Sequence, residues 1–489
     1  MKVRSEKLKS QEKSSSLLLY LAFVFIVFGA KAIIISNFGS SIPFWDQWDA
    51  QADSLYRPWL LGSRHWMDLF ASHNEHRIFT TRALSLLLLY LNKGVWDPMF
   101  EMYVNAMLHT VALLFLLFLM QKGLERGTKF AFFFFASLLF AVPFGYENTL
   151  AGFQSQFYFL LLFSFIFLWA IIQFHTAPKR WFPVLVFSAL LSFFSLASGA
   201  LTMAAGVGTL VIRWLCGIQR TRATLLLIIL LSLACAAAIY FTPIIPRHAA
   251  LKAKSLLDFV IDILRATGGG LLYFPVVLFL IRHFQNIRSA TGHSWFVVAL
   301  CLWVTGQIFA IAYGRSSWIL TSRYLDLFAI GILLNGYCLL FMLQGEESVE
   351  LLINKAFIWF VFVAACLGLI FPSMIKAIES KNAACLRNED NVRGYLTTRD
   401  YTFLQKAPYE EIPYDDAVRL KSLLDNKTIS SILTPAVNSN NTRNGLGFYG
   451  KTSRTVFSVI GSFLLFTGIG LFMAELIKSY LLNKGEECP

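Results

Sequence analysis

Long apolar stretches separated by short polar connectors make up most of the chain. About 20 consecutive apolar residues form a helix long enough to cross a lipid bilayer. We therefore predict an all-α polytopic membrane protein with about twelve transmembrane helices. Their expected starts lie near Ser16, Met99, Phe130, Gln156, Phe182, Ala200, Thr224, Thr267, Ser294, Leu325, Ala356 and Val456.

Two longer polar segments interrupt this pattern, Asn37–Pro98 and Ile375–Arg454. The first contains an apolar run, Thr80–Leu91, which is too short to cross and is expected to be a helix at the membrane surface. The second contains "YDDAVRLKSLLDNKTISSIL", whose apolar residues recur at helical spacing. We divide the chain into a transmembrane core (1–374) with a first exported loop (37–98), an exported α-rich segment (375–455), and a last span with its tail (456–489).

Composition favours a membrane protein over a soluble one. Hydrophobic residues make up 56% of the chain and charged residues 15%, whereas a soluble domain carries about 25% charged residues. Forty-seven phenylalanines occur, many in runs such as "FAFFFFASLLF". Only Cys385 falls within the second polar segment, so a disulfide inside that segment is excluded.

The net charge of +13 comes from basic residues in short connectors, such as "QKGLERGTK", "APKRW" and "RWLCGIQRTR". They form no single patch, so no nucleic-acid partner is expected. Lys and Arg in short loops mark the cytoplasmic side. The basic start of the chain precedes a run of span length without a small-residue cleavage site, which predicts a retained signal anchor. An even number of spans then puts both termini in the cytoplasm and both long polar segments outside.

Acidic residues gather directly after the first span, in "PFWDQWDAQAD". Asp46, Asp49 and Asp53 are spaced by three and four residues, so on a helix they share one face. A carboxylate there can take a proton from a hydroxyl group. The alternative is structural, with Asp46 capping a helix and the other two on a solvated face.

Histidines follow in "HNEHR", which contains His73, Glu75, His76 and Arg77. The spacing differs from the HExxH of zinc peptidases. A divalent metal held by these groups together with Asp46 stays open, and so does a polar loop that satisfies its own hydrogen bonds. No other cofactor is expected.

Two further stretches place polar groups on the same side of the membrane. "GYENTLAGFQSQF" carries Glu147, Gln154 and Gln156 near membrane depth, where such groups usually face a cavity. "GRSSWILTSRY" carries Arg315 and Arg323, and Arg247 follows the seventh span. Cations on the outer side run against the usual charge bias, and a phosphate group would explain them. The alternative is ordinary loop cations. Carboxylates that accept a proton and cations that stabilise a departing phosphate suit transfer of a sugar from a lipid phosphate.

With these residues in view, the chain resembles the GT-C superfamily of membrane glycosyltransferases, which use polyprenyl-phosphate sugars. The motifs "WDQW", "HNEHRI", "EN…GFQSQF" and "SRY" carry the resemblance, together with an acidic motif after the first span and a juxtamembrane helix before the second. The layout also resembles that of phage-borne, serotype-converting O-antigen glucosyltransferases. It extends over nearly the whole chain.

The resemblance implies an enzyme of the bacterial inner membrane that transfers a hexose, with glucose expected, to a glycan such as lipid-linked O-antigen. Inversion at the sugar is implied, as are a companion synthase for the donor and a flippase. The base of the family matches Asp46, or Asp49 if the alignment shifts. We assign Glu75 a further catalytic role, and the remaining candidates are expected to hold the donor phosphate (Arg77, Arg247, Arg315, Arg323) or to support the acceptor (His73, His76, Glu147, Gln154, Gln156).

A transporter or flippase for lipid-linked glycans is the main alternative. Such proteins place substrate sites on charged groups within their spans. Charges within the spans are scarce here, and the two exported segments are large and unequal. We therefore expect a transferase.

Overall fold

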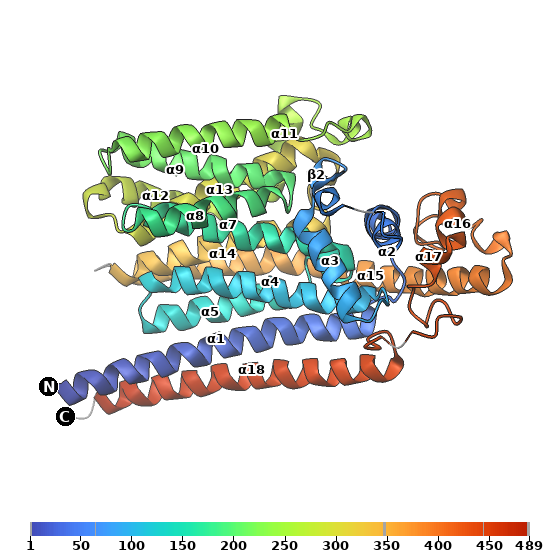
Figure 1. Cartoon of the computed structure of the whole chain (residues 1–489). Coiled ribbons are helices and arrows are strands. Elements are labelled where there is room, and N and C mark those ends of the chain that lie inside the picture. Colours follow the sequence, from blue (N-terminus) through green and yellow to red (C-terminus); the bar gives the residue numbers. More distant parts are fainter. Residues whose placement is uncertain (1, 64, 346–348, 444, 487–489) are drawn as a thin grey trace.

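The computed structural model of the chain describes residues 2–63, 65–345, 349–443 and 445–486, and nearly all of its regular structure is helical. Thirteen helices form a bundle (Figure 1). They are α1 (Lys2–Phe38), α4 (Pro98–Met120), α5 (Arg126–Ala141), α7 (Ser155–Gln173), α8 (Pro178–Phe193), α9 (Ala200–Leu215), α10 (Arg222–Tyr240), α11 (Leu256–Ala266), α12 (Phe274–Gln285), α13 (Gly292–Gly314), α14 (Ser322–Met342), α15 (Val349–Thr398) and α18 (Lys451–Glu486).

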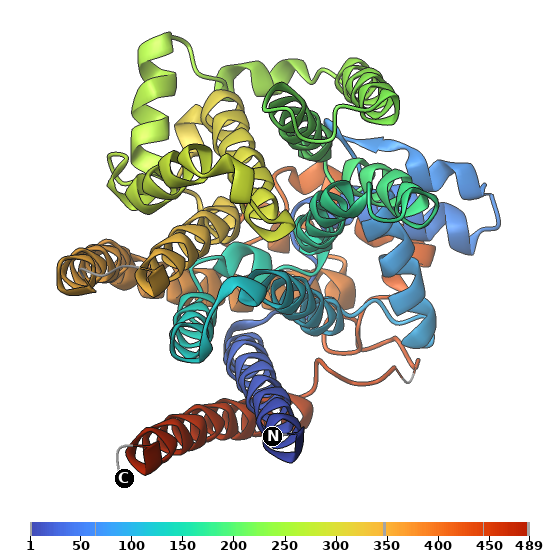
Figure 2. The same ribbon diagram turned by 90° about the vertical axis from the view of Figure 1, so that its left-hand side faces the viewer.

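Both termini lie at one end of the bundle, which we call the terminal end (Figures 1 and 2). The short elements gather at the opposite end, the loop end. These elements are the π-helix η1 (Trp48–Tyr56), α2 (Arg57–Leu60), β1 (Ser72–His73), β2 (His76–Arg77), α3 (Phe79–Leu91), α6 (Tyr146–Thr149), α16 (Ala417–Asp425) and α17 (Lys427–Ser430). The predicted short helices at Thr80–Leu91 and within residues 414–433 are therefore confirmed.

Among the described residues, nine helices are long and apolar enough to cross a membrane, or ten if a bent pair counts as one span. The chain is thus an all-α polytopic membrane protein, with fewer such helices than the twelve expected. The spans expected at Phe130 and Phe182 correspond to α5 and α8, which have only 16 residues each. The span expected at Thr267 is the pair α11 and α12, bent by 56°. Gly268, Gly269 and Gly270 make this bend with positive φ angles, which glycine adopts without steric cost.

The first and last membrane helices pack along each other (Figure 1). Gly29 of α1 lies so close to α18 that a Cβ atom on it would stand 2.7 Å from the carbonyl oxygen of Gly461. Small residues let helix backbones approach in this way, which strengthens dispersion contacts where no hydrophobic driving force exists between helices. This contact fixes where the second long polar segment rejoins the bundle.

The two long polar segments, 37–98 and 375–454, fold together into one module at the loop end. Trp48 and Trp96 of the first segment share an apolar cluster with Leu420, Leu424 and Leu433 of the second, and all five are essentially fully buried. The long helix α15 leads into this module and continues without a break past residue 375. Residues far apart in the sequence therefore meet around η1.

We expect the loop end to face outward and the terminal end to face the cytoplasm. Cys216 is exposed beyond the end of α9, and Asn440 is exposed in the module. A membrane-impermeant maleimide added to intact cells should label an Asn440→Cys variant and should reach Cys216 only after permeabilisation. Labelling of Cys216 in intact cells, with Asn440→Cys protected, would reverse the orientation.

Candidate functional site

A buried carboxylate in the bundle anchors the acidic motif. Glu101, in the first turn of α4, is 3% exposed. It accepts hydrogen bonds from Gln51 Nε2 (2.8 Å), Gln47 Nε2 (3.2 Å) and the Tyr56 hydroxyl (3.0 Å). A buried acceptor with three donors holds its surroundings in one arrangement, because each donor left unpaired would cost free energy. Glu101 therefore fixes both ends of η1 against the membrane domain.

The three aspartates of the motif point to different partners. Asp49 and Asp53 both pair with Arg419 of α16, at 3.1 Å and 2.6 Å. Asp49 also accepts a hydrogen bond from the hydroxyl of Tyr414. These two carboxylates thus join the first long polar segment to the second. Asp46 takes no part in this contact.

Asp46 lies beside the histidine motif instead. Its Oδ1 atom is 3.6 Å from Nε2 of His73, and its side chain is 37% exposed. The residue before it, Trp45, has a positive φ of 52°, which is unusual for a bulky side chain and is found at strained functional positions. Trp45 is held by a hydrogen bond from its backbone N–H to the carbonyl of Pro413 (2.9 Å) and by ring contact with Tyr409 (5.4 Å). Asp46 is therefore accessible and its backbone is fixed.

Arg323 approaches this site from α14. Its guanidinium lies over the ring of Trp45 at 5.2 Å, and its Nε donates to Glu147 Oε2 at 3.3 Å. Glu147 also accepts from the backbone N–H of Arg323 (3.2 Å). The predicted residues Arg323 and Glu147 are thus brought next to the acidic motif, where they bind each other.

Glu75 is engaged in ion pairs. It binds the guanidinium of Arg315 and lies 2.8 Å from Nδ1 of His248. Burial by itself would raise the pKa of Glu75, but its electrostatic interactions with His76 and Arg315 outweigh burial and lower that pKa to about 2. A carboxyl group with so low a pKa accepts protons poorly. The position of Glu75 favours a structural role over the catalytic role predicted for it.

The two histidines of the motif differ in their surroundings. His76 accepts a hydrogen bond from the backbone N–H of Ala197 at Nδ1 (3.3 Å). Burial lowers the pKa of His76 to about 4, despite the nearby carboxylate of Glu75, so its ring is neutral at pH 7. His73 contacts Asp46 and packs edge-on against Phe153 (5.5 Å). Of the two, only His73 reaches the acidic motif.

The remaining predicted residues have local partners. Arg77 donates to the carbonyl of Phe70 (3.1 Å), and Arg247 donates to Asn74 Oδ1 (2.7 Å). Gln156 donates to Gln154 Oε1 (3.0 Å) and accepts from the hydroxyl of Thr81 (3.3 Å). The two glutamines therefore tie α7 to the surface helix α3.

The described residues contain no group of three His, Cys, Asp or Glu side chains that could hold a metal ion. In particular, Glu75 turns toward Arg315 and His248, while Asp46 approaches only His73. Within the part of the chain that the structure describes, the geometry offers no ligand set for the divalent metal considered above.

Buried charges within the spans, among them Lys31 and Asp326, were missed by the sequence analysis. Lys31 of α1 donates to the hydroxyl of Thr149 (3.1 Å), and Asp326 of α14 accepts from Asn148 Nδ2 (2.9 Å). Lys31 is 5% exposed and Asp326 6%. Lys31 and Asp326 carry opposite charges. They bind Thr149 and Asn148, the two residues of α6 that follow Glu147 in the chain. The sequence carried a signal for these contacts, namely a single ionisable residue inside an apolar stretch. Such residues rarely face lipid.

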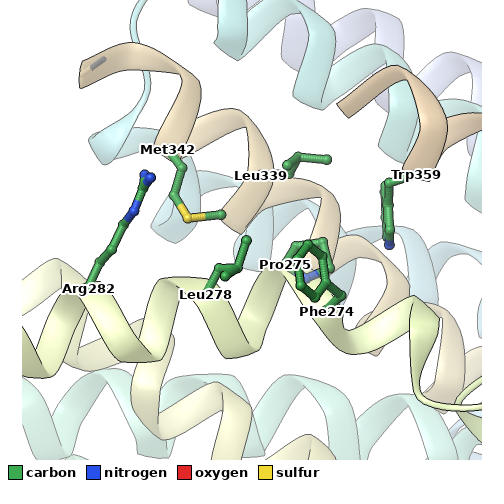
Figure 3. Close-up of a pocket in the computed structure, with 7 residues that line it drawn as sticks. All are labelled: Phe274, Pro275, Leu278, Arg282, Leu339, Met342 and Trp359. Atoms are coloured by element: carbon green, nitrogen blue, oxygen red, sulfur yellow. The ribbon is translucent and has the colours of Figure 1, made fainter. Parts of the chain in front are cut away.

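Two hollows lie away from the acidic motif. One is an apolar groove between α12, α14 and α15, lined by Phe274, Pro275, Leu278, Arg282, Leu339, Met342 and Trp359 (Figure 3). Arg282 and Met342 mark one end of this groove, and they belong to the last turns of α12 and α14. The other is a wider hollow between α11 and α13, lined by Ala253, Lys254, Ser255, Leu256, Phe259, Phe309 and Tyr313. Only the second lies at the loop end.

Comparison of the chain with family models, curated proteins and solved structures found no match.

Proposed function

We propose that this chain is a glycosyltransferase of the bacterial inner membrane, which transfers a hexose from a polyprenyl phosphate to a lipid-linked glycan on the outer face. Asp46 is the general base that removes the proton of the acceptor hydroxyl. The hydroxyl attacks the sugar opposite the phosphate, so the configuration inverts. Because phosphate leaves readily, no separate acid is needed, in contrast to hydrolysis with two carboxyl groups.

The observation that carries this proposal is the separation of Asp46 from its acidic neighbours. Asp49 and Asp53 are paired with Arg419, whereas among the described residues the ion contact of Asp46 is with His73 and not with an arginine or lysine. A general base must be able to reach the proton that it abstracts. Asp46 follows the first membrane helix by eight positions, counted from Phe38, so it lies near the surface where a lipid phosphate would carry its sugar.

Cations around Asp46 support recognition of the donor phosphate. Arg323 lies over Trp45, the residue next to Asp46, and Arg247 binds Asn74, the residue next to His73. Arginine binds phosphate with paired hydrogen bonds. The hollow between α11 and α13 offers Phe259, Phe309 and Tyr313 to the apolar part of a lipid.

Replacing Arg323 with alanine is expected to weaken use of the donor by about 10- to 100-fold, because a hydrogen bond to a charged group contributes about 1.5–3 kcal/mol. Arg323→Lys should also weaken it, since an ammonium lacks the paired donors. Donor KM measured on purified protein checks this. Lys406→Ala is the control, because Lys406 is an exposed cation of the module at the loop end. Equal KM values for Arg323→Ala and Lys406→Ala would rule out a role of Arg323 in donor binding.

Profiling cell-surface glycans of cells with and without the chain tests the proposed function. A transferase adds a sugar branch, so the glycan repeat should gain the mass of one hexose. Unchanged repeat mass together with less surface glycan in cells without the chain would count against a transferase.

A transporter or flippase is the second candidate, and Lys31 and Asp326 favour it. Both are buried within membrane helices and bind adjacent residues of α6. Charged groups inside spans often mark substrate or proton pathways. A transporter would move lipid-linked glycan between leaflets without consuming a sugar donor.

A further inference from the structure

A group of buried nitrogen atoms belongs to α9, α12 and α13, three helices that run to the terminal end of the bundle, opposite the loop end (Figure 1). Arg213 is in the last turn of α9, His283 is near the end of α12, and Trp295 is near the start of α13. Their exposures are 5%, 7% and 1%. Three helices that end or begin at the same level of the bundle thus each contribute one side chain.

The indole of Trp295 joins the other two side chains. The guanidinium of Arg213 lies over its ring at 5.6 Å, and the ring of His283 packs perpendicular to it with centroids 4.7 Å apart. A guanidinium stacked on an aromatic face keeps its N–H groups directed outward in its own plane. The contacts of Trp295 therefore gather the nitrogen atoms of Arg213 and His283 around one indole ring.

These donors lack acceptors in the protein. Within residues 2–63, 65–345, 349–443 and 445–486, no hydrogen-bond partner exists for Arg213 Nε and Nη1, His283 Nε2 or Trp295 Nε1, all of which are buried. Burying a cation without a counter-charge is unfavourable, and so is burying a polar group without a hydrogen-bond partner. So many unpaired donors around one indole indicate a ligand that supplies the acceptors.

We propose that Arg213, Trp295 and His283 form a binding site for a phosphate group at the cytoplasmic end of the membrane domain. Phosphate supplies both the negative charge that Arg213 needs and several acceptor oxygens in the geometry of a guanidinium edge. Neutral ligands would leave the charge uncompensated. The phosphate can belong to the headgroup of an inner-leaflet lipid or be free in solution. This site is separate from the proposed sugar transfer, because it lies at the other end of the bundle.

Thermal unfolding of the purified full-length protein in detergent tests this site with two probes, phosphatidylglycerol and inorganic phosphate, and with diacylglycerol as the phosphate-free control. Wild-type protein should show saturable stabilisation by at least one probe and none by diacylglycerol. Arg213→Gln should weaken the apparent Kd by about tenfold or more, as loss of a charge-assisted pair does. Arg222→Gln, at the exposed first residue of α10, should leave the Kd unchanged.

The pattern of stabilisation identifies the source of the phosphate. Stabilisation by phosphatidylglycerol alone indicates a lipid headgroup, and stabilisation by both probes indicates a site open to free phosphate. His283→Phe keeps the guanidinium and the aromatic contact, and it should weaken the Kd several-fold even if Arg213→Gln fails to fold. Absence of saturable stabilisation in the wild type, or unchanged Kd values in both Arg213→Gln and His283→Phe, would overturn the proposal.

Discussion

Replacing Asp46 with asparagine is expected to reduce sugar transfer by about 10²–10⁴-fold, the usual contribution of a general base. The amide cannot take the proton of the acceptor hydroxyl, whereas its size matches that of the carboxylate. Membrane insertion and donor binding should persist, because Asp46 is partly exposed and its ion-pair contact among the described residues is with His73. Single-turnover transfer with donor already bound measures this effect on the chemical step.

Asp49→Asn is the matched control, since it makes the same change three residues along. The Asp49 carboxylate pairs with Arg419 and Tyr414, so its loss should loosen the module and leave single-turnover rates within a few-fold of the wild type. Near-normal transfer by Asp46→Asn would remove the proposed base. A severe loss in Asp49→Asn alone would assign the base to Asp49.

Replacing Glu101 with alanine is expected to lower both stability and transfer. Gln47, Gln51 and Tyr56 would lose a shared acceptor, and each buried donor left unpaired costs about 1–3 kcal/mol. The three costs share one acceptor and need not add. The melting temperature in detergent should fall by several degrees, and transfer should fall with it because η1 carries the residues next to Asp46.

Two variants separate this effect from a general response to truncation. Glu101→Gln keeps one acceptor oxygen and should be milder than Glu101→Ala. Met107→Ala removes a side chain of the same helix that is 43% exposed, and it should be nearly neutral. A melting temperature for Glu101→Ala equal to that of Met107→Ala would contradict the anchoring role.

Apolar periodicity predicted the helical membrane domain, but it could not fix the ends of individual helices. In α5, the run "FAFFFFASLLFAV" leads directly into Pro143, and the helix ends at Ala141 after 16 residues. In α15, polar composition suggested an exported segment from Ile375, yet the helix continues to Thr398. Four residues of this stretch are buried at intervals of seven, seven and three residues: Ile378, Cys385, Val392 and Tyr395. The polar residues between them hide this spacing in the sequence.

The sequence indicated which residues belong to the candidate site better than it indicated which of them contact each other. Spacings of three and four residues put Asp46, Asp49 and Asp53 on one face of an α-helix. The segment instead becomes a π-helix from Trp48 onward, whose wider turns change which side chains align. The contacts Glu75–Arg315 and Asp49–Arg419 join residues 240 and 370 positions apart. Such pairs depend on tertiary packing and leave no local signal.

Reaction of the purified chain with a polyprenyl-phosphate hexose tests the proposed transferase most directly. The protein is reconstituted in vesicles without a membrane gradient, together with a lipid-linked glycan acceptor, and the product anomer is determined. We predict that the donor is consumed, that the glycan gains one hexose of inverted configuration, and that Asp46→Asn prevents this. Transbilayer movement of the glycan without any donor consumption would contradict the transferase and identify a flippase.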